Sequence, residues 1–439
     1  MKDIFLVSLL IVLAFSSAHG FTLSLKHTIL SASNLNEFQK HQQLLQISKL
    51  RTSDSIRAPI SLALSGFFYV EVQIGTPPVK ANLVFDTGSS VTWTQCAQCQ
   101  VCFSVAVPNF DPRRSTTYQR MPYNHPLCLS EPVANSSGRF CSYELQYYGG
   151  EVIRGDLALE TFTFGLDSDN GSGSKQQLKL PKVAFGCGLY NQNVTDFVND
   201  TRNPISGVFG IGRDPSSILQ QLSSITLQKF SYCLPLLLFG DSVQHHRNYH
   251  TLLNFGNDAK ITGHGVQTTP ILEGWDGSYY LKLDAISFNG RLLPIDPKLF
   301  VTNGLGVVMD SGTPYTFLVE TAYNQLRQAV VEYFLENSGL KPLDSSRSGF
   351  PLCYNDTIHH QGRDFAFPTI ELHFQRAATL QLEQATSFQV FKDVNESCLM
   401  IMPTNDESGV NLLGAFQQVN YRFLFDVSSS ELSFAPDIC

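Results

Sequence analysis

The stretch NLVFDTGSSVTW, from Asn82 to Trp93, decides the fold of this protein. Its apolar run Leu83-Val84-Phe85 predicts a buried strand, which leads directly into Asp86 and a turn that contains glycine. Ending a buried strand on a carboxylate costs free energy unless the charge is used or paired. We therefore interpret Asp86 as a candidate functional residue.

A second copy of this pattern lies about one lobe further along the chain. In GVVMDSGTPY the apolar run Val307-Val308-Met309 precedes Asp310-Ser311-Gly312-Thr313. Each copy is followed, at a similar distance, by two apolar residues and a glycine, at Val208-Phe209-Gly210 and Leu412-Leu413-Gly414. The repeat predicts two related lobes, each with a buried strand beside its own aspartate loop, and a cleft where the two acids meet.

Length, composition and strand patterns indicate an all-β protein of two lobes. A chain of 439 residues exceeds what one hydrophobic core usually organises. Its formal net charge of −8 disfavours nucleic acid as a partner. Short alternating segments such as FYVEVQI and LALETFTF predict strands, whereas residues 320–335 have the clearest helical pattern. The Gly- and Ser-rich stretch LDSDNGSGSKQQ predicts a surface hairpin loop.

The N-terminus has the pattern of a secretory leader. Residues 1–20 combine an early lysine, an apolar run and small residues, which predicts a signal peptide, and we expect no membrane contact after its removal. Residues 21–66 are net basic, lack cysteine and contain an amphipathic helical pattern. They predict a propeptide that covers an acidic site until low pH releases it, with a linker or N-terminal arm as the alternative. The N-terminal lobe is then 67–276 and the C-terminal lobe 277–439.

The cysteines and glycosylation motifs fit passage through an oxidising compartment. An even number of ten cysteines predicts up to five disulfides. The run Cys96-x-x-Cys99-x-x-Cys102 lacks the fourth ligand of an iron–sulfur site, so we expect no metal. Glycosylation motifs stand at Asn135, Asn170, Asn193, Asn199, Asn355 and Asn395. We expect a secreted, extracellular protein, with a vacuole as the alternative destination.

The paired Asp-Thr-Gly-Ser and Asp-Ser-Gly-Thr signatures resemble those of the pepsin-type aspartic endopeptidases. More narrowly, WTQCAQCQVCF, AFGCG, FSYCLP and the terminal APDIC resemble the atypical, nepenthesin-like plant branch. The similarity runs from about residue 66 to Cys439. It implies a bilobal all-β acid protease fold, a cleft between the lobes with a flap hairpin over it, and protein or peptide substrates. We expect a monomer that needs no cofactor.

The resemblance also assigns roles to individual residues. Asp86 and Asp310 take the place of the catalytic pair. The residues that support this pair are Thr87, Gly88, Ser89, Ser311, Gly312 and Thr313. Of these, Ser89 and Thr313 match the residues whose hydroxyls bond the outer carboxylate oxygens, while the two glycines let backbone N–H groups approach.

The flap and one disulfide follow from the same resemblance. Tyr147 takes the position of the flap tyrosine, and Trp93 that of a tryptophan which contacts it. Tyr148 replaces a glycine of the family at the turn, so we expect a stiffer or shifted flap tip. The family pattern pairs Cys353 with Cys398.

Two carboxylates within hydrogen-bond reach cannot both ionise, so such a pair retains one proton over a mildly acidic range. The ionised member accepts a proton from a water molecule that attacks the peptide carbonyl, and the protonated member hydrogen-bonds the developing oxyanion. Neither a metal nor a covalent intermediate is required. These residues predict an aspartic endopeptidase active at acidic pH.

The main alternative is a catalytically silent binding protein on the same scaffold, similar to the plant xylanase inhibitors. Such relatives generally lose part of the aspartate motifs, whereas both motifs are intact here. The sequence contains no His-Glu-x-x-His and no Gly-x-Ser-x-Gly, which argues against a metalloprotease and a serine hydrolase. A secreted cysteine protease would need an unpaired thiol, and the even cysteine count argues against one.

Overall fold

The structure, a computed structural model, describes residues 57–63, 66–130, 134–135, 138–166, 176–194, 203–235, 251–261, 263–274, 276–301, 305–355, 367–382, 384–404 and 409–439. All of them belong to one compact unit, Ser53–Cys439. The predicted signal peptide and the predicted propeptide up to residue 56 lie outside the described residues, as do Asn170 and Asn199.

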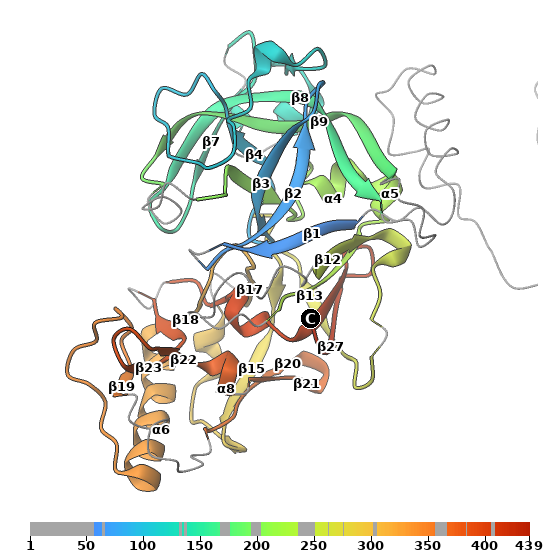
Figure 1. Cartoon of the computed structure of the whole chain (residues 1–439). Helices are drawn as coiled ribbons and strands as arrows, with labels where there is room; N and C mark the ends of the chain where they lie inside the picture. The colour runs from blue at the N-terminus through green and yellow to red at the C-terminus, as the bar shows by residue number, and fades with distance from the viewer. Residues whose placement is uncertain are drawn as a thin grey trace, which may run out of the picture. The chain divides into compact units, whose positions relative to one another are not determined.

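The first half of this unit consists of strands with short helices between them (Figure 1). Its strands are β1 (Arg57–Leu62), β2 (Phe68–Ile74), β3 (Val79–Asp86), β4 (Trp93–Gln95), β5 (Gln119–Arg120), β6 (Ala134–Asn135), β7 (Ser142–Gln146), β8 (Val152–Leu166), β9 (Gln176–Gln192), β10 (Gly207–Gly210), β11 (Lys229–Cys233) and β12 (Thr251–Phe255). Its helices are η1 (Pro112–Arg114), α3 (Pro126–Ser130), α4 (Ile218–Gln221), α5 (Ser223–Thr226) and η2 (Gly256–Asp258).

The second half repeats this organisation and adds one long helix. Its strands are β13 (Gln267–Leu272), β14 (Tyr280–Leu281), β15 (Leu283–Phe288), β16 (Arg291–Leu292), β17 (Val307–Met309), β18 (Thr316–Leu318), β19 (Cys353–Asn355), β20 (Ile370–Phe374), β21 (Ala378–Leu382), β22 (Phe388–Phe391), β23 (Glu396–Leu399), β24 (Ile401–Pro403), β25 (Leu412–Leu413), β26 (Tyr421–Asp426) and β27 (Glu431–Pro436). Its helices are η3 (Pro297–Phe300), α6 (Glu320–Ser338), η4 (Gln375–Ala377), α8 (Gln384–Ser387) and η5 (Ala415–Gln418).

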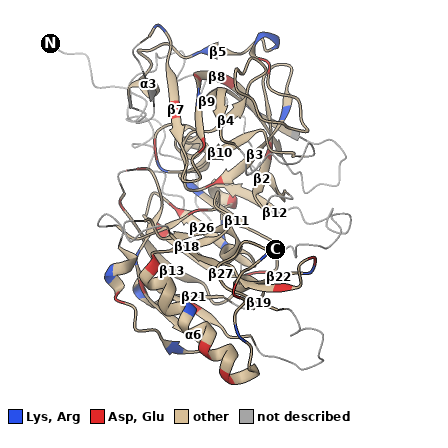
Figure 2. Ribbon diagram, turned by 90° about the vertical axis from the view of Figure 1, so that its left-hand side faces the viewer, with Lys and Arg blue, Asp and Glu red and all other residues tan. Residues whose placement is uncertain are grey.

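The elements agree with the sequence patterns. The expected helix is α6, whose ribbon contains residues of both charge signs (Figure 2). The stretch FYVEVQI forms β2, and its alternating burial matches its alternating sequence. The Gly- and Ser-rich stretch connects β8 to β9, which pair antiparallel up to Leu166 opposite Gln176. The hairpin prediction is therefore confirmed, although residues 167–175 lie outside the described part.

One antiparallel layer joins the two halves. Within it, β11 pairs with β26, from Lys229 opposite Asp426 to Cys233 opposite Arg422. β12 and β1 extend the layer on the side of β11, and β27 and β13 extend it on the side of β26. The strand β1 lies inside the segment predicted as a propeptide, yet it pairs with both β2 and β12. Residues 57–62 are thus part of the main sheet.

Aromatic side chains fill the core above this layer. The ring of Phe230 stacks on Phe425 with centroids 4.5 Å apart, and Tyr232 meets Phe85 edge to face at 4.9 Å. Phe85 is the residue before Asp86, so this packing lies directly behind the first aspartate. Aromatic pairs of this kind contribute stabilisation beyond the area they bury. The end of β3, which carries Asp86, is therefore held in place by packed aromatic rings.

All ten cysteines are paired. The five disulfides are Cys96–Cys187, Cys99–Cys102, Cys128–Cys141, Cys233–Cys439 and Cys353–Cys398. Cys233 ends β11 and Cys439 ends the chain, so their bridge fastens the C-terminus to the layer that joins the halves.

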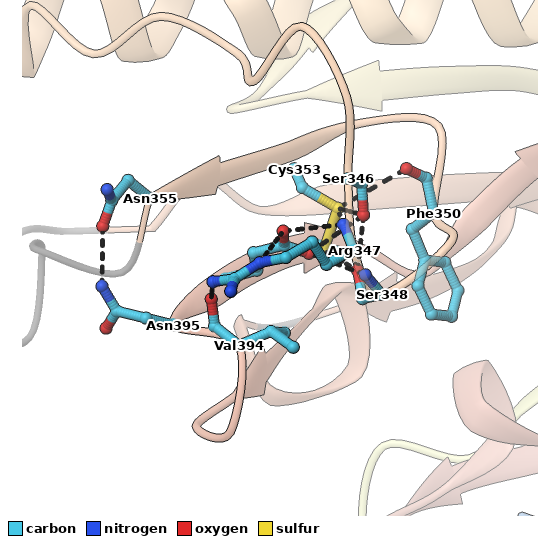
Figure 3. A network of polar contacts seen from close by, with 10 residues as sticks. Ser346, Arg347, Ser348, Phe350, Cys353, Asn355, Val394 and Asn395 are labelled. Carbon is cyan, nitrogen blue, oxygen red and sulfur yellow. Dashed lines mark hydrogen bonds and ion pairs between the residues drawn. A yellow bond between two sulfur atoms is a disulfide. The ribbon is translucent and has the colours of Figure 1, made fainter.

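A buried carboxylate reinforces the hairpin that carries Cys398. Glu396 accepts hydrogen bonds from the Ser346 hydroxyl at 2.9 Å, the Arg347 backbone N–H at 2.8 Å and the Ser348 backbone N–H at 3.0 Å. The side chain of Glu396 is only 3% exposed. Figure 3 shows residues 346–348 folded against the disulfide at this point. Glu396 thus satisfies the donors of the 346–348 loop and holds this loop against the disulfide.

Candidate active site

Each aspartate is placed by two parallel strands. In the first half β10 runs beside β3, with Phe209 opposite Phe85 and Gly210 opposite Asp86. In the second half β25 runs beside β17, with Leu413 opposite Met309. The predicted threading of a buried strand beside each aspartate loop is thus confirmed. Neither aspartate loop is free to shift along its strand, because hydrogen-bonded neighbours hold it on both sides.

The two carboxylates are held by matching sets of donors. Asp86 accepts hydrogen bonds from the Gly88 N–H on Oδ1 at 2.8 Å and from the Ser89 hydroxyl on Oδ2 at 2.5 Å. Asp310 accepts them from the Gly312 N–H on Oδ1 at 2.8 Å and from the Thr313 hydroxyl on Oδ2 at 2.5 Å. The two sites are therefore closely similar, and Asp310 accepts one further bond, from the Thr313 N–H on Oδ1 at 3.2 Å.

The glycines show how closely the two turns approach. A Cβ atom added to Gly88 would lie 2.8 Å from Cγ of Asp310, and one added to Gly312 would lie 2.4 Å from Cγ of Asp86. Each glycine therefore faces the carboxylate of the other half. A larger residue would push the aspartates apart, which explains why glycine occupies both positions.

Thr87 and Ser311 connect the two turns beneath the carboxylates. The Thr87 hydroxyl donates to the Met309 carbonyl at 2.7 Å, and the Ser311 hydroxyl donates to the Phe85 carbonyl at 2.8 Å. Both residues are fully enclosed by protein. These bonds cross between the halves, so they set the distance between the two aspartates.

Burial dominates the electrostatics of the pair. Asp86 is 6% exposed and Asp310 7%. Burial first and the negative charge of Asp310 second raise the pKa of Asp86 to about 7, against the hydrogen bonds from Ser89 and Gly88, which lower it. Burial also raises the pKa of Asp310, against the hydrogen bonds from Thr313 and Gly312. The pair thus holds one shared proton under mildly acidic conditions.

The flap hairpin is tied to this pair. It consists of β7, β8 and the turn between them. Trp93 Nε1–H donates to the Tyr147 hydroxyl at 2.8 Å. Burial and the negative charge of Asp86 raise the pKa of Tyr147, whereas Trp93 and Ser89, which itself donates to Asp86, lower it. The flap tyrosine is thus fixed by Trp93 next to the first aspartate.

The flap turn accommodates Tyr148 without backbone strain. The Gly150 N–H donates to the Tyr147 carbonyl at 3.0 Å, which makes Tyr148 the first central residue of the turn. The positive φ of +90° falls on Gly150, and Tyr148 is not among the residues of positive φ. A glycine is therefore needed at 150 but not at 148. Tyr148 instead presents its side chain to solvent, with 78% of it exposed.

Sequence reasoning did not single out Asp276 and Tyr280, which are hydrogen-bonded to each other at the start of β14. The Tyr280 hydroxyl donates to Oδ2 of Asp276 at 2.6 Å, and the Ser278 N–H donates to Oδ1 at 3.1 Å. The negative charge of Asp276 raises the pKa of Tyr148, after burial. Nothing in the local sequence marks Asp276, because the flap residue on which its charge acts comes from a segment far away in the chain.

Other predicted sites lie on the surface of the described part. Asn193, Asn355 and Asn395 are exposed, and Asn395 donates to Asn355 at 2.8 Å (Figure 3). Asn135 lies in β6. Cys353, Glu396 and Cys398 are close enough together to suggest a metal site, but the two sulfurs are bonded to each other and offer no thiolate.

Comparison with known proteins places the chain in a family. Residues 68–257 match the family model described as xylanase inhibitor N-terminal, and residues 278–436 match xylanase inhibitor C-terminal. Aspartic proteinase nepenthesin-1 of Nepenthes gracilis is 29% identical over 96% of this chain and 90% of its own length. Aspartyl protease family protein 2 of Arabidopsis thaliana is 32% identical over 85% of this chain and 71% of its own length.

Solved structures show the same fold. The crystal structure of edgp has a TM-score of 0.68 at 18% identity and covers 88% of this chain and 95% of its own. Basic 7S globulin from soybean has a TM-score of 0.66 at 18% identity, with 87% and 96% covered. The fold is bilobal and pepsin-like, with most of its regular structure in strands. The chain belongs to the pepsin-type aspartic proteinases, in their nepenthesin-like plant branch.

Proposed function

We propose that this protein is a secreted aspartic endopeptidase that hydrolyses peptide bonds in protein substrates at acidic pH. One observation carries the proposal: Asp86 and Asp310 lie in matching turns, each turn's glycine faces the carboxylate of the other, and both acids have a raised pKa. A frame that only stabilised the fold would not need two neighbouring buried acids, because a buried carboxyl pair is costly.

The mechanism follows from the single proton of the pair. A water molecule held by both carboxylates gives a proton to the ionised aspartate as its oxygen attacks the peptide carbonyl. The protonated aspartate then hydrogen-bonds the oxyanion, and the proton acquired from water passes to the leaving nitrogen. Ser89 and Thr313 orient the outer oxygens, so the inner oxygens are directed at the water. The chemistry uses side chains of this chain alone.

Residues outside the pair take supporting roles in the proposal. Thr87, Gly88, Ser311 and Gly312 hold the two acids at a fixed separation, and Tyr147 with Trp93 covers them.

We also propose secretion by a signal peptide to the apoplast or a vacuole, glycosylation at the exposed asparagines, and release of a propeptide. Because β1 is a paired strand, we place the propeptide cleavage point before Arg57. No described helix has the length and apolarity to cross a membrane.

The second candidate is a silent binding protein, favoured by the xylanase inhibitor description of the family models. A cleavage assay separates the two. Acid-treated wild type should degrade a denatured protein at acidic pH, and Asp86→Asn should lose this activity by at least about a hundredfold. Asp284→Asn is the matched control, since Asp284 pairs with Lys282 on the surface. Equal degradation by Asp86→Asn, or none by wild type, would exclude the endopeptidase.

A further inference from the structure

Two glycosylation motifs that are separate in the sequence meet on the surface of the second half. Asn355, in the motif Asn-Asp-Thr, ends β19, and Asn395, in the motif Asn-Glu-Ser, directly precedes β23. Both side chains are exposed, and Nδ2 of Asn395 donates to Oδ1 of Asn355 at 2.8 Å (Figure 3). Two acceptors in the sequence are thus one position in space.

The backbone holds the two asparagines together. The strands β19 and β23 pair antiparallel with Asn355 opposite Glu396, and the disulfide Cys353–Cys398 links the same two strands. Glu396 directly follows Asn395 and is itself held by its hydrogen bonds to residues 346–348. A shift of one strand along the other, which could separate the asparagines, would break these contacts.

The position has room for one glycan. A glycan is attached to Nδ2 of asparagine, and the nitrogen and oxygen of one amide are about 2.3 Å apart. With the hydrogen bond of 2.8 Å, the two amide nitrogens therefore lie within about 5 Å of each other. Because glycans are bulky, the first sugars on both nitrogens would compete for the same volume.

The hydrogen bond favours modification of Asn355. Asn355 takes part through Oδ1, and no described residue hydrogen-bonds to its Nδ2. A glycan on that nitrogen leaves Oδ1 able to accept. Asn395, in contrast, uses its Nδ2 as the donor. A single glycan on Asn355 therefore keeps the observed contact intact.

The surroundings of Ser397 point to the same choice. Glycosylation needs an accessible motif, and the Ser397 hydroxyl that completes the second motif belongs to a residue only 1% exposed. Asn395 can therefore be modified only before β23 pairs. Because the chain is made from its N-terminus, Asn355 becomes available 40 residues earlier.

We propose that the folded protein carries a glycan on Asn355 and that this glycan excludes one on Asn395, which remains the hydrogen-bond donor beside it. The inference rests on the proposed passage through the secretory pathway, because the modification takes place there. A chain modified at both positions would be unable to close β19 against β23 as the structure shows.

The disulfide makes the exclusion measurable within single molecules. The full-length chain is produced in a plant cell host, and the secreted protein is digested with trypsin without reduction. Residues 348–363 and 393–422 each follow a basic residue and end on one, so they are released as one pair joined by Cys353–Cys398. This pair contains only the two motifs in question. Mass spectrometry should find one glycan per pair, on Asn355, and no pair with two.

Two variants test whether Asn355 is what keeps Asn395 unmodified. Thr357→Ala removes the first motif but keeps the asparagine side chain, whereas Asn355→Gln removes the acceptor itself. In both variants the occupancy of Asn395 should rise from near zero to most of the molecules. Asn193→Gln is the matched control, since it removes an exposed motif elsewhere and should leave Asn395 unmodified.

Each other outcome would overturn the exclusion. Wild-type pairs with two glycans, or with their glycan on Asn395, contradict it directly. An Asn395 that stays unmodified in the variants would show that Asn355 is not the cause, and Thr357→Ala decides alone if Asn355→Gln is not secreted. An unmodified pair in a protein with glycans elsewhere removes this inference only. A protein without glycans at any motif removes the proposed glycosylation as well.

Discussion

Thr87 and Ser311 bind each other's backbone from opposite halves of the protein. The Ser311 N–H donates to the Thr87 hydroxyl at 2.9 Å, and the Thr87 N–H donates to the Ser311 hydroxyl at 3.1 Å. Each residue is thus both donor and acceptor to its partner. Each hydroxyl also donates a hydrogen bond to a backbone carbonyl of the other half. This exchange joins the two aspartate turns into one rigid piece.

Removing either hydroxyl should destabilise the protein. In Ser311→Ala the buried N–H of Thr87 and the carbonyl of Phe85 lose their partner, which costs about 1 to 3 kcal/mol of unfolding free energy. Thr87→Ala should cost a similar amount. Because the bonds form one network, the double variant should lose less than the sum of the two. Urea unfolding at pH 5 measures all three, and strict additivity would show that the bonds act independently.

Asp86 should reduce stability at neutral pH. Its pKa rises from 3.8 to about 7 on folding, mainly through burial, so the stabilisation from its protonated form is complete below about pH 4 and is lost as the pH rises through 7. Asp86→Asn should therefore be more stable than wild type at pH 8, by a few kcal/mol. The two proteins should have similar melting temperatures at pH 4. A gain for Asp86→Asn that does not vary with pH would contradict this account.

The rate of hydrolysis should follow the same proton. The reaction needs the pair singly protonated, and the pKa of Asp86 is about 7. We expect kcat/KM to fall as the pH rises through this value, and to fall again at low pH when the second carboxylate takes up a proton. A pH profile of kcat/KM from pH 2 to 8 gives both limbs. A rate that keeps rising above neutral pH would be incompatible with the shared proton.

The hydrogen bond from Trp93 should control the flap tyrosine. In Trp93→Phe a smaller aromatic ring replaces the buried indole and the Tyr147 hydroxyl loses its donor, so the flap tyrosine is no longer fixed next to Asp86. We expect kcat/KM to fall about tenfold, and the melting temperature to fall as well, because the smaller ring leaves a cavity in the core. Tyr147→Phe should give a comparable loss, and the double variant should be no worse. A loss in Trp93→Phe that exceeds the loss in Tyr147→Phe would indicate a packing role for Trp93.

Glu396 should contribute stability that declines as the solution becomes more acidic. Burial raises its pKa, but the hydrogen bonds from Arg347, Ser348 and Ser346 outweigh this and lower the value to about 2. The stabilisation is therefore fully present above the ordinary glutamate pKa of 4.5 and is lost progressively as the pH falls from there through 2. Glu396→Gln should cost about 2 to 3 kcal/mol at pH 5. Denaturant unfolding at pH 5 and pH 2 checks this, since the difference should shrink at the lower pH.

Much of the fold could be predicted because its signals are local and repeated. The alternation in FYVEVQI marks β2 through the pleat of a strand, which places successive side chains on opposite faces. The spacing of apolar residues marks α6 in the same way. The two aspartate motifs and the apolar pairs that follow them indicated which strands would lie side by side, and β10 and β25 do so.

The sequence by itself determined which residues are able to form the site: the two acids, their glycines and hydroxyls, and the flap tyrosine with Trp93. Only the tertiary structure decided how they meet. The Thr87–Ser311 exchange and the approach of Gly88 to Asp310 and of Gly312 to Asp86 each join segments far apart in the chain. A local pattern records what one strand or turn prefers, whereas these contacts depend on how two lobes pack across a shared sheet.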